Sequence, residues 1–426
     1  MTVVINGDTG ISPVTASGTS ASVDGMTVGR GGGEVSTCTA VGASALTANT
    51  SGTENTAIGA IALQANTSGA INTAVGRAAL YSNIVGNYNS AVGQYALFAN
   101  TGSYNTALGA QSLNSNTTAS NNTAVGSTAL YSNTTGTPNT AIGRASLYTN
   151  TTGGFNVAVG GTDGAINATL GVNTTGAYNS AVGYGALGQN TTASNNTAVG
   201  YQAGYSTTTA ASSTYVGYQA GYNLTTGSVF CAFGYRAGYT QATNTRNTYL
   251  GYLAGTLHTG NYSLFVGSYA GQSATSGNSN CFIGDYAGAS VTTAGGNTFL
   301  GQYSGAGITT GQNNTVIGAY DGNQGGLDIR TSSNYIVLSD GDANPRIVAN
   351  AVGDVFIGTT TPNAVDGSKL YVYYNGDNGI VSRVDSGNYC YVAHTGNGSN
   401  TGLAMSFRWT STQVGRITTT SSATSY

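Results

Sequence analysis

The chain has 426 residues, of which 6% are charged, and its formal net charge is −3. An average protein has about 25% charged residues; here Gly (66) and Tyr (29) are abundant instead. This composition favours strands and turns, and 11 basic residues over the whole chain exclude a groove that binds nucleic acid.

The first predicted segment, residues 1–35, carries no sign of secretion. It begins MTVVINGDTG, without the basic and apolar regions of a signal peptide. No apolar run in the chain reaches the roughly 18 residues that span a bilayer. We therefore expect a protein that is made in the cytosol and does not insert into a membrane.

A 17-residue repeat fills residues 36–320. A glycine ends each TAVG-like segment, and we call these residues the ruler glycines. Successive ruler glycines are 17 residues apart, except for two steps of 16 and one of 23. The seventeen ruler glycines are Gly42, Gly59, Gly76, Gly93, Gly109, Gly126, Gly143, Gly160, Gly183, Gly200, Gly217, Gly234, Gly251, Gly267, Gly284, Gly301 and Gly318. This regularity indicates a solenoid, in which each unit packs on its neighbours.

Seventeen residues fit one coil of two short strands and two turns, and are too few for a pair of helices. Stacked coils form parallel sheets in which equivalent residues make columns, ~4.8 Å apart along the axis. Position −1, the residue before the ruler glycine, is Val, Ile or Leu in sixteen units, including Ile58 and Val75. We predict that this column is the interior. Position −4 is Asn in thirteen units, including Asn55 and Asn72, and stacked Asn side chains can hydrogen-bond along a column.

In two further columns the side chains change size in opposite directions along the chain. Before about residue 200, position −2 is Ala and position +4 is usually Leu, as in the unit of Ala57 and Leu63. Later units mostly carry Tyr or Phe at −2 and Gly at +4, as in the unit of Tyr215 and Gly221. Cores tolerate exchanges that conserve volume, so we predict that the two columns touch.

Two later units, those of Ala198 and Ala232, break this rule because both columns are small there. We expect Tyr201, Phe233 and Tyr235 to fill the space in these units. Even so, each coil has a thin core, and a slender roll buries little apolar surface alone. This predicts that several copies pack side by side, as a homotrimer.

The N-T-A-V-G-x-x-A-L unit, over roughly residues 36–320, resembles the head repeats of YadA-like trimeric adhesins. The resemblance implies a left-handed parallel β-roll in a bundle of three chains, although the period here is longer and the Asn-rich turn differs. MTVVINGDTGI, VDGMTVGRGGG, NYIVLSDGDANPRI and VFIGTTTP resemble segments of long repeat proteins of bacteriophage tail fibres.

The final stretch, GLAMSFRWTSTQVGRITTTSSATSY, is similar to the segment that precedes the C-terminal intramolecular chaperone of such fibres. The Ser-Asp and Arg-Leu-Lys motifs of that self-cleaving chaperone are absent here. The resemblance implies attachment to the virion tail or baseplate through residues 1–35 and recognition of a host surface glycan or protein.

Chemical motifs are sparse. The acidic residues between 36 and 320 are Glu54, Asp163 and Asp285, too far apart to form a pair for glycoside hydrolysis within one chain. The two histidines, His258 and His394, lie in no nucleophile–base or metal motif, and we expect both at the surface. We therefore predict no catalytic residue, no cofactor and no metal site, and no enzyme.

Other polar and sulfur-containing residues fit structural roles. SDGDANP, with Asp340 and Asp342, predicts a polar turn closed by Pro345, because the rest of a calcium-binding loop is missing. Cys231 and Cys281 occupy one column three coils apart, beyond the reach of a disulfide, and we expect them to be buried.

Tyrosines recur in GYQAGY-type units at two positions of the repeat. Because the recurrence follows the period, we favour an aromatic ladder that stabilises the stack over a strip that stacks on sugars. The tyrosines concerned are Tyr201, Tyr205, Tyr218, Tyr222, Tyr235 and Tyr239.

After residue 320 the repeat stops. Residues 321–362 read as a connector with strands at NYIVLS and DVFIG, and residues 363–426 as a β-rich trimeric end with strands at KLYVYY, GIVSRV, NYCYVAH, GLAMSFRWT and VGRITTT. A non-repeating end with Trp, Tyr and Arg suits recognition, although a core that closes the trimer is an alternative. The receptor-binding candidates are Tyr389, Tyr391, His394, Arg408 and Trp409.

Together these features predict an all-β, trimeric fibre: a parallel β-roll of about seventeen coils with a β-rich C-terminal end. We expect a phage tail fibre, located in the virion, that presents a receptor-binding surface to the host. The alternatives are a bacterial surface trimeric adhesin, which should carry a signal sequence and an anchor, and a polysaccharide depolymerase, which needs clustered carboxylates. An ice-binding solenoid, with two outward Thr columns, is more remote.

Overall fold

We analysed a computed structural model of the chain. It describes residues 20–23, 26–162, 167–240, 242–243, 245–358 and 360, and the backbone of six strands within 370–425. In these residues there is no α-helix, and η1 (Gly32–Glu34) is a short 3-10 turn, so the fold is all-β as predicted. The chain divides into two compact units, residues 1–276 and 277–426, which are described separately.

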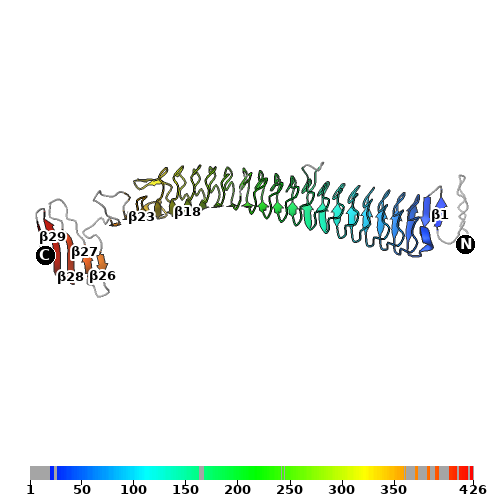
Figure 1. The fold of residues 1–426 in the computed structure, drawn as a ribbon, viewed down its shortest axis with the longest axis horizontal. Helices are drawn as coiled ribbons and strands as arrows, with labels where there is room; N and C mark the ends of the chain where they lie inside the picture. Colours follow the sequence, from blue (N-terminus) through cyan, green and yellow to red (C-terminus); the bar gives the residue numbers. More distant parts are fainter. Residues whose placement is uncertain are drawn as a thin grey trace. The chain divides into compact units, whose positions relative to one another are not determined.

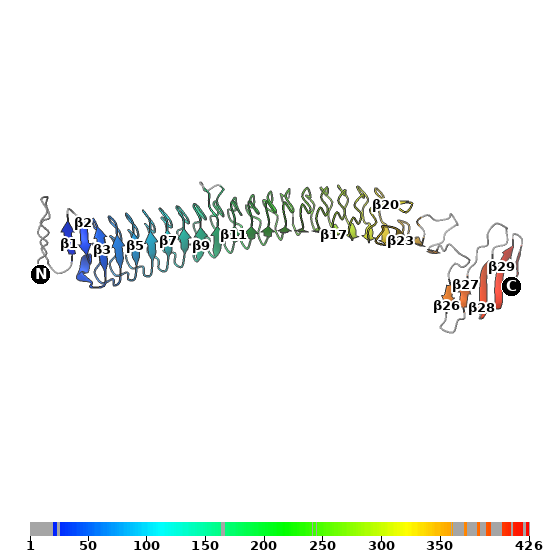
Figure 2. The ribbon, with the colours of Figure 1, turned by 180° about the vertical axis from the view of Figure 1, so that it is seen from behind.

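The first unit is a stack of coils with one short strand in each (Figures 1 and 2). An antiparallel pair, β1 and β2, precedes the stack, and β2 pairs in the antiparallel sense with the first strand of the stack, β3. The strands are β1 Ser20–Val23, β2 Met26–Gly29, β3 Thr39–Gly42, β4 Thr56–Ile58, β5 Thr73–Val75, β6 Ser90–Val92, β7 Thr106–Leu108, β8 Thr123–Val125, β9 Asn139–Ile142, β10 Asn156–Val159, β11 Ser180–Val182, β12 Thr197–Val199, β13 Thr214–Val216, β14 Cys231–Phe233, β15 Thr248–Leu250 and β16 Leu264–Val266.

From β3 to β16 each strand pairs in parallel with the next, in the register set by the repeat. Ala57, for example, pairs with Ala74. The predicted solenoid is confirmed, but each coil has one strand and not two. The second segment of the coil is not extended, because positions +2 and +4 have positive φ, as at Ile61 (54°) and Leu63 (50°).

The second unit contains three more coils and then a different arrangement. β17, β18 and β19 continue the same pattern, and β22 pairs in parallel with β19 before β23 and β24 add antiparallel strands. The strands are β17 Cys281–Ile283, β18 Thr298–Leu300, β19 Thr315–Ile317, β20 Asn323–Gln324, β21 Leu327–Asp328, β22 Ile336–Ser339, β23 Pro345–Ala349, β24 Val355–Ile357, β25 Leu370–Val372, β26 Val381–Arg383, β27 Tyr389–Val392, β28 Leu403–Trp409, β29 Thr412–Thr420 and β30 Ala423–Ser425.

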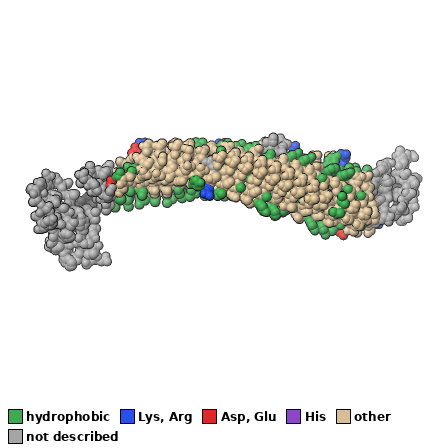
Figure 3. Space-filling view, in the orientation of Figure 1, with side chains coloured by type: hydrophobic (Ala, Val, Ile, Leu, Met, Phe, Trp, Pro, Cys, Tyr) green, Lys and Arg blue, Asp and Glu red, His purple; other side chains and the backbone are tan. Residues whose placement is uncertain are grey.

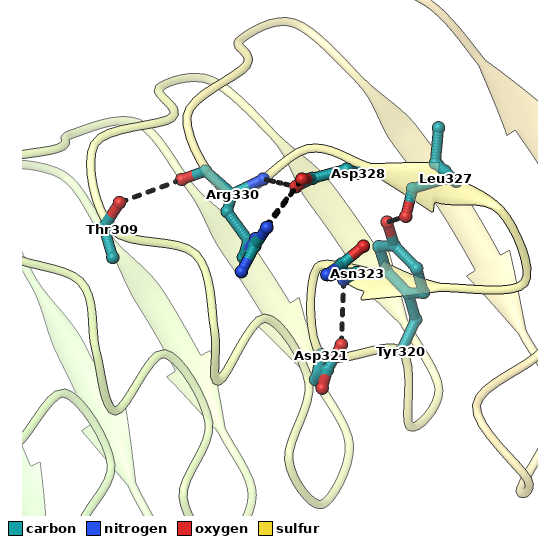
Figure 4. Close-up of polar contacts among 7 residues, drawn as sticks. All are labelled: Thr309, Tyr320, Asp321, Asn323, Leu327, Asp328 and Arg330. Atoms are coloured by element: carbon teal, nitrogen blue, oxygen red, sulfur yellow. Dashed lines mark hydrogen bonds and ion pairs between the residues drawn. The ribbon is translucent and has the colours of Figure 1, made fainter.

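A hairpin of β20 and β21 follows the last ruler glycine (Figure 4). The buried Tyr320 donates its hydroxyl proton to the carbonyl of Leu327 (2.9 Å), and Arg330 forms an ion pair with Asp328 (2.8 Å). The Arg330 guanidinium holds the pKa of Asp328 at about 2. These contacts fix the hairpin beside the final coil.

The prediction for position −1 is wrong, because this aliphatic column lies outside the coil. Ile58 is 41% exposed, and Val75 is half-buried. The interior is instead formed by Asn55 at −4 and Ala57 at −2, which are both fully buried. Side chains alternate along a strand, so once −4 and −2 point inward, −3 and −1 must point outward.

The predicted contact between positions −2 and +4 is confirmed. A Cβ added to Gly221 would lie 2.3 Å from Cδ1 of Tyr215, so the aromatic ring occupies the space that Leu fills in earlier coils. Position +4 also has positive φ in every such coil, near 50° at Leu97 and 60° at Gly221. Glycine adopts this conformation without the strain of about 1 kcal/mol that Leu carries.

The two exceptional units are filled by other residues than we predicted. The space beside Gly238 is taken by Phe230, at position −4, and by Tyr249 of the following coil. Tyr201 and Tyr235 are instead exposed, by 43% and 39%, and Phe233 is half-buried on the outward column. They point away from the core because positions +1 and −1 lie outside the coil.

The predicted Asn ladder at position −4 is confirmed, and it is buried. Asn72 donates from Nδ2 to Oδ1 of Asn55 (3.1 Å) and to the carbonyl of Gly86 (2.8 Å), while its own Oδ1 accepts from the backbone N–H of Asn89 (2.9 Å). Each carboxamide therefore bridges adjacent coils and leaves no buried polar group unpaired.

A second buried Asn ladder, which the sequence analysis did not predict, lies at position +7. Asn66 donates to Oδ1 of Asn49 (3.0 Å), and Asn83 donates to Oδ1 of Asn66 (2.9 Å). The two ladders touch where Asn105 donates to Oδ1 of Asn100 (3.2 Å). The full second ladder is Asn49, Asn66, Asn83, Asn100, Asn116, Asn133, Asn150, Asn173 and Asn190.

Candidate interaction surfaces

The outward aliphatic column forms one surface, here called the aliphatic stripe. It consists of the −1 side chains, flanked at −3 by uncharged Thr, Ser, Val, Cys and Leu side chains. Its exposed members are between 38% and 48% open to solvent, and Figure 3 shows hydrophobic side chains in rows along one edge. In the first unit they are Ile58, Val92, Leu108, Ile142, Val182, Val199 and Leu250, and in the second Leu300 and Ile317.

The ruler glycine beside this stripe sets the spacing of the coils. Gly59 has φ of 133°, and a Cβ there would lie 2.6 Å from the backbone of Gly76 in the next coil. Gly76 and Gly93 repeat this approach. A side chain at this position would push neighbouring coils apart, so the glycines keep the stripe continuous along each stack.

A second surface, the tyrosine strip, belongs to the first unit. Tyr184, Tyr201, Tyr218, Tyr235 and Tyr252 stack at position +1, with ring centroids 5.2–5.3 Å apart and ring planes within 16° of parallel. Tyr205, Tyr222 and Tyr239 form a parallel ladder at position +5, with the same spacing. The predicted aromatic ladder is therefore present.

Amide and guanidinium groups at position +2 lie in the same coils as the two tyrosine ladders. Gln219 donates from Nε2 to Oε1 of Gln202 (2.9 Å), and Arg236 donates from Nε to Oε1 of Gln219 (3.0 Å). The Arg236 guanidinium also lies over the ring of Tyr239, 4.7 Å from its centroid. Burial and the neighbouring tyrosines of its ladder raise the pKa of Tyr222.

The expectation that His258 lies at the surface is wrong. Its side chain is fully buried at position +7, the column of the second Asn ladder, and Nδ1 is 2.6 Å from the hydroxyl of Tyr249. The ring also packs edge-on against Phe265. Burial holds the pKa of Tyr249 well above its usual range. His258 thus continues a polar core column, while His394 lies outside the described residues.

The cysteines also differ from expectation. Cys231 and Cys281 are half-exposed, because both stand at the outward position −3. Partial burial raises the pKa of each thiol. Cys38, at the inward position −4, is buried and directs its sulfur to the carbonyl of Gly52 (3.3 Å).

The SDGDANP segment forms a compact polar turn. Asp340 accepts hydrogen bonds from the backbone N–H groups of Asp342 (3.1 Å) and Asn344 (2.9 Å) and pairs with Arg346. Its carboxylate is thus neutralised by arginine. Within the described residues no three acidic, His or Cys side chains gather in a way that could hold a metal ion.

The C-terminal receptor-binding candidates lie mainly on two strands of a five-stranded antiparallel sheet, β26 to β30. The register places Tyr389 of β27 opposite Arg408 of β28, and Tyr391 opposite Ser382. Trp409 ends β28. The side chains of this sheet are outside the described part of the structure, so the proposed site remains a prediction.

No helix in the described part of the chain is long and apolar enough to cross a bilayer. Comparisons with protein families, with curated proteins and with solved structures found no match to this chain.

Proposed function

We propose that the chain is the subunit of a homotrimeric, adhesive fibre, most consistent with a phage tail fibre. In this proposal residues 1–35 attach to the virion tail or baseplate, the coils form the shaft, and the fibre presents a surface that binds a host glycan or protein. The observation that carries the proposal is the aliphatic stripe, which runs along each stack of coils without a charged residue in columns −1 and −3.

The size of the stripe supports association with identical chains. Fourteen coils of the first unit, spaced ~4.8 Å apart, make a face roughly 60 Å long and about 10 Å wide. That corresponds to about 600 Å² per chain, close to the ~800 Å² that each partner buries in a standard interface. This area is at the upper end of the roughly 300–600 Å² covered by the largest exposed patch of a typical monomer, and such patches are often functional.

The geometry of the stripe favours parallel copies around one axis. The −1 column and the −3 column beside it repeat with each coil, so identical columns of neighbouring chains can face one another at equal heights. Three chains is the number that the resemblance to trimeric adhesins implies. The thin core of each coil, made of Ala, Asn and one large residue, gives an additional reason for burial against neighbours.

Native cysteines beside the stripe provide a direct test. In a parallel trimer with the stripes on the axis, the three copies of Cys231 lie at one height near the axis. A short bifunctional maleimide should then join chains into dimers and trimers through Cys231 and Cys281. The fourth cysteine, Cys390, is first replaced by Ser in every protein compared. In that background a Cys231→Ser, Cys281→Ser variant should show no such products, and Cys38, which is buried, should not react.

A matched pair of substitutions tests the same face through mass. Val182→Asp with Val199→Asp places charge in the stripe and should reduce the solution mass to that of one chain. Thr192→Asp, on an exposed turn of a neighbouring coil, should leave the mass unchanged. If the stripe variant keeps the same mass as the native chain, the stripe does not hold the fibre together.

The location can be tested with antibodies against the full chain. Labelling of virion tails in electron micrographs is the expected result. Labelling of the bacterial envelope in uninfected cells would instead support the alternative of a surface adhesin.

A further inference from the structure

The tyrosine strip is the surface of the first unit that is best equipped to bind a ligand. The tyrosines of its +1 ladder are between 38% and 46% exposed. The residues at position +2 in the same coils, Gln202, Gln219 and Arg236, carry two amides and one guanidinium. Columns −1 and −3, in contrast, carry no amide, tyrosine hydroxyl or guanidinium. The strip therefore offers a ligand hydroxyl, amide and guanidinium groups side by side, each able to form hydrogen bonds.

The rings themselves are not free to stack on a ligand, because each covers the face of the next. Tyr218 lies between Tyr201 and Tyr235, 5.2 Å from each and nearly parallel to both. What the strip offers outward is therefore ring edges and hydroxyl groups. The hydroxyls of these three tyrosines make no hydrogen bond to any residue that the structure describes, and they recur once per coil.

The electrostatic surroundings favour a ligand rich in hydroxyl groups. Between residues 39 and 276 the structure describes one acidic residue, Glu54, which lies many coils away from the strip. The charge of Arg236 is held against Tyr235, Tyr239 and Gln219. Hydroxyl, amide and guanidinium groups can all donate to sugar oxygens, and the first two can also accept.

We infer that the tyrosine strip binds an extended, β-linked polysaccharide lying parallel to the solenoid axis. The spacing of the hydroxyls, which follows the 5.2 Å separation of the rings, is close to the length that one sugar adds to such a chain. Each sugar would thus lie beside one coil, and because neighbouring sugars of a β-1,4 chain are turned by about half a turn, every second sugar would present the same face to the strip. The inference rests on the adhesive role proposed above and names its ligand class; three strips per fibre would add avidity.

Binding of the full chain to cellohexaose and chitohexaose, measured by titration calorimetry, tests the inference. At least one of these extended hexasaccharides should bind, and maltohexaose, whose α-linked chain coils, should bind more weakly. Tyr218→Phe and Tyr235→Phe keep the stacked rings and remove only hydroxyls. Each should weaken binding about fivefold, because a net hydrogen bond is lost.

Tyr88→Phe and Tyr104→Phe are matched controls. These two rings also stack, 4.9 Å apart, and are exposed, but they lie at position −5 and outside the strip. They should leave binding unchanged. No binding of either extended hexasaccharide, or an equal loss in the control pair, would overturn the inference.

The solution mass, measured on the same samples, separates this inference from the fibre itself. A trimer that binds no hexasaccharide overturns the strip and leaves the fibre in place. A monomer that binds overturns the trimer and leaves the strip. If the Tyr→Phe variants lose trimer mass together with binding, the strip is an inter-chain contact, and the inference is wrong.

Discussion

Removing one carboxamide from the first Asn ladder tests how the coils are held together. Asn89 donates to the carbonyl of Gly102 (2.9 Å) and to Oδ1 of Asn72 (3.1 Å). Its Oδ1 accepts from the backbone N–H of Asn105 (3.0 Å) and from Nδ2 of Asn105 (3.3 Å). An Asn89→Ala variant loses all four bonds.

Most of the groups left behind keep another partner. The Gly102 carbonyl still accepts from Asn100, and Oδ1 of Asn72 still accepts from the backbone N–H of residue 89. The backbone N–H of Asn105, however, loses its acceptor in a fully buried site, which costs about 1–3 kcal/mol. The other lost bonds and the small void add about 2 kcal/mol, so we expect a local loss of about 3–5 kcal/mol.

The chain itself supplies the matched control. In a later coil Ser213 stands in the same column, and its Oγ accepts from the backbone N–H of Phe230 (3.2 Å). Asn89→Ser should therefore preserve an acceptor for Asn105 and cost at least about 1 kcal/mol less than Asn89→Ala.

Hydrogen exchange read by mass spectrometry suits this comparison, because repeat arrays open locally and not in one step. Amides of residues 85–110 should exchange faster in Asn89→Ala than in Asn89→Ser, whereas coils far from the site should be unaffected. Equal exchange in the two variants would refute the reasoning, since the hydrogen bond to the Asn105 N–H would then contribute nothing.

Three other predictions address the core. Gly221→Ala should destabilise its coil by about 3 kcal/mol in the same exchange assay, because the new Cβ would lie 2.3 Å from Tyr215 and the residue has positive φ. Gly341→Ala is the control and should be neutral, since a Cβ there would meet open space. Burial raises the pKa of Tyr215 to about 12 from 10.0, so the protonated hydroxyl supports the folded state fully below pH 10. As the pH rises through 12, up to about 3 kcal/mol of the free energy of unfolding should be lost. Tyr215→Phe should reduce this loss in unfolding titrations at alkaline pH, and an unchanged pH profile would contradict the prediction. His258→Ala should lower the free energy of unfolding by about 1 kcal/mol less in a Tyr249→Phe background than in the native chain, because the hydrogen bond between the two side chains is already lost there. A double-mutant cycle measured by denaturation tests this. Strictly additive effects of the two substitutions would count against the hydrogen bond.

The period alone predicted the solenoid, its parallel register and the first Asn ladder. The exchange of Leu63-type and Tyr215-type residues also predicted a real contact, because two buried columns must conserve their combined volume. Repetition makes such relations visible, since the same contact is sampled in every coil.

The inside and outside of the coil were harder to predict. Val75 looks like a core residue by hydrophobicity, but the buried Asn72 and Ala74 fix the parity of the strand and turn it outward. The interior therefore contains polar ladders that hydropathy cannot identify. His258 was misplaced for the same reason, as it stands in the column of the second ladder.

The candidate site could be predicted in part. The C-terminal strands that carry Tyr389 and Arg408 appear where the alternating pattern placed them, and their register follows from strand pairing. The tyrosine ladders followed from the repeat. That their faces are covered and their hydroxyls are open follows only from the ring geometry, which no sequence pattern specifies.

The solution mass of the purified full chain, by multi-angle light scattering or analytical centrifugation, tests the central claim most directly. The proposed fibre predicts a mass near three times the 42.5 kDa chain, unchanged on dilution. A stable monomer would contradict it, because the aliphatic stripe would then remain open to water along the whole of each stack.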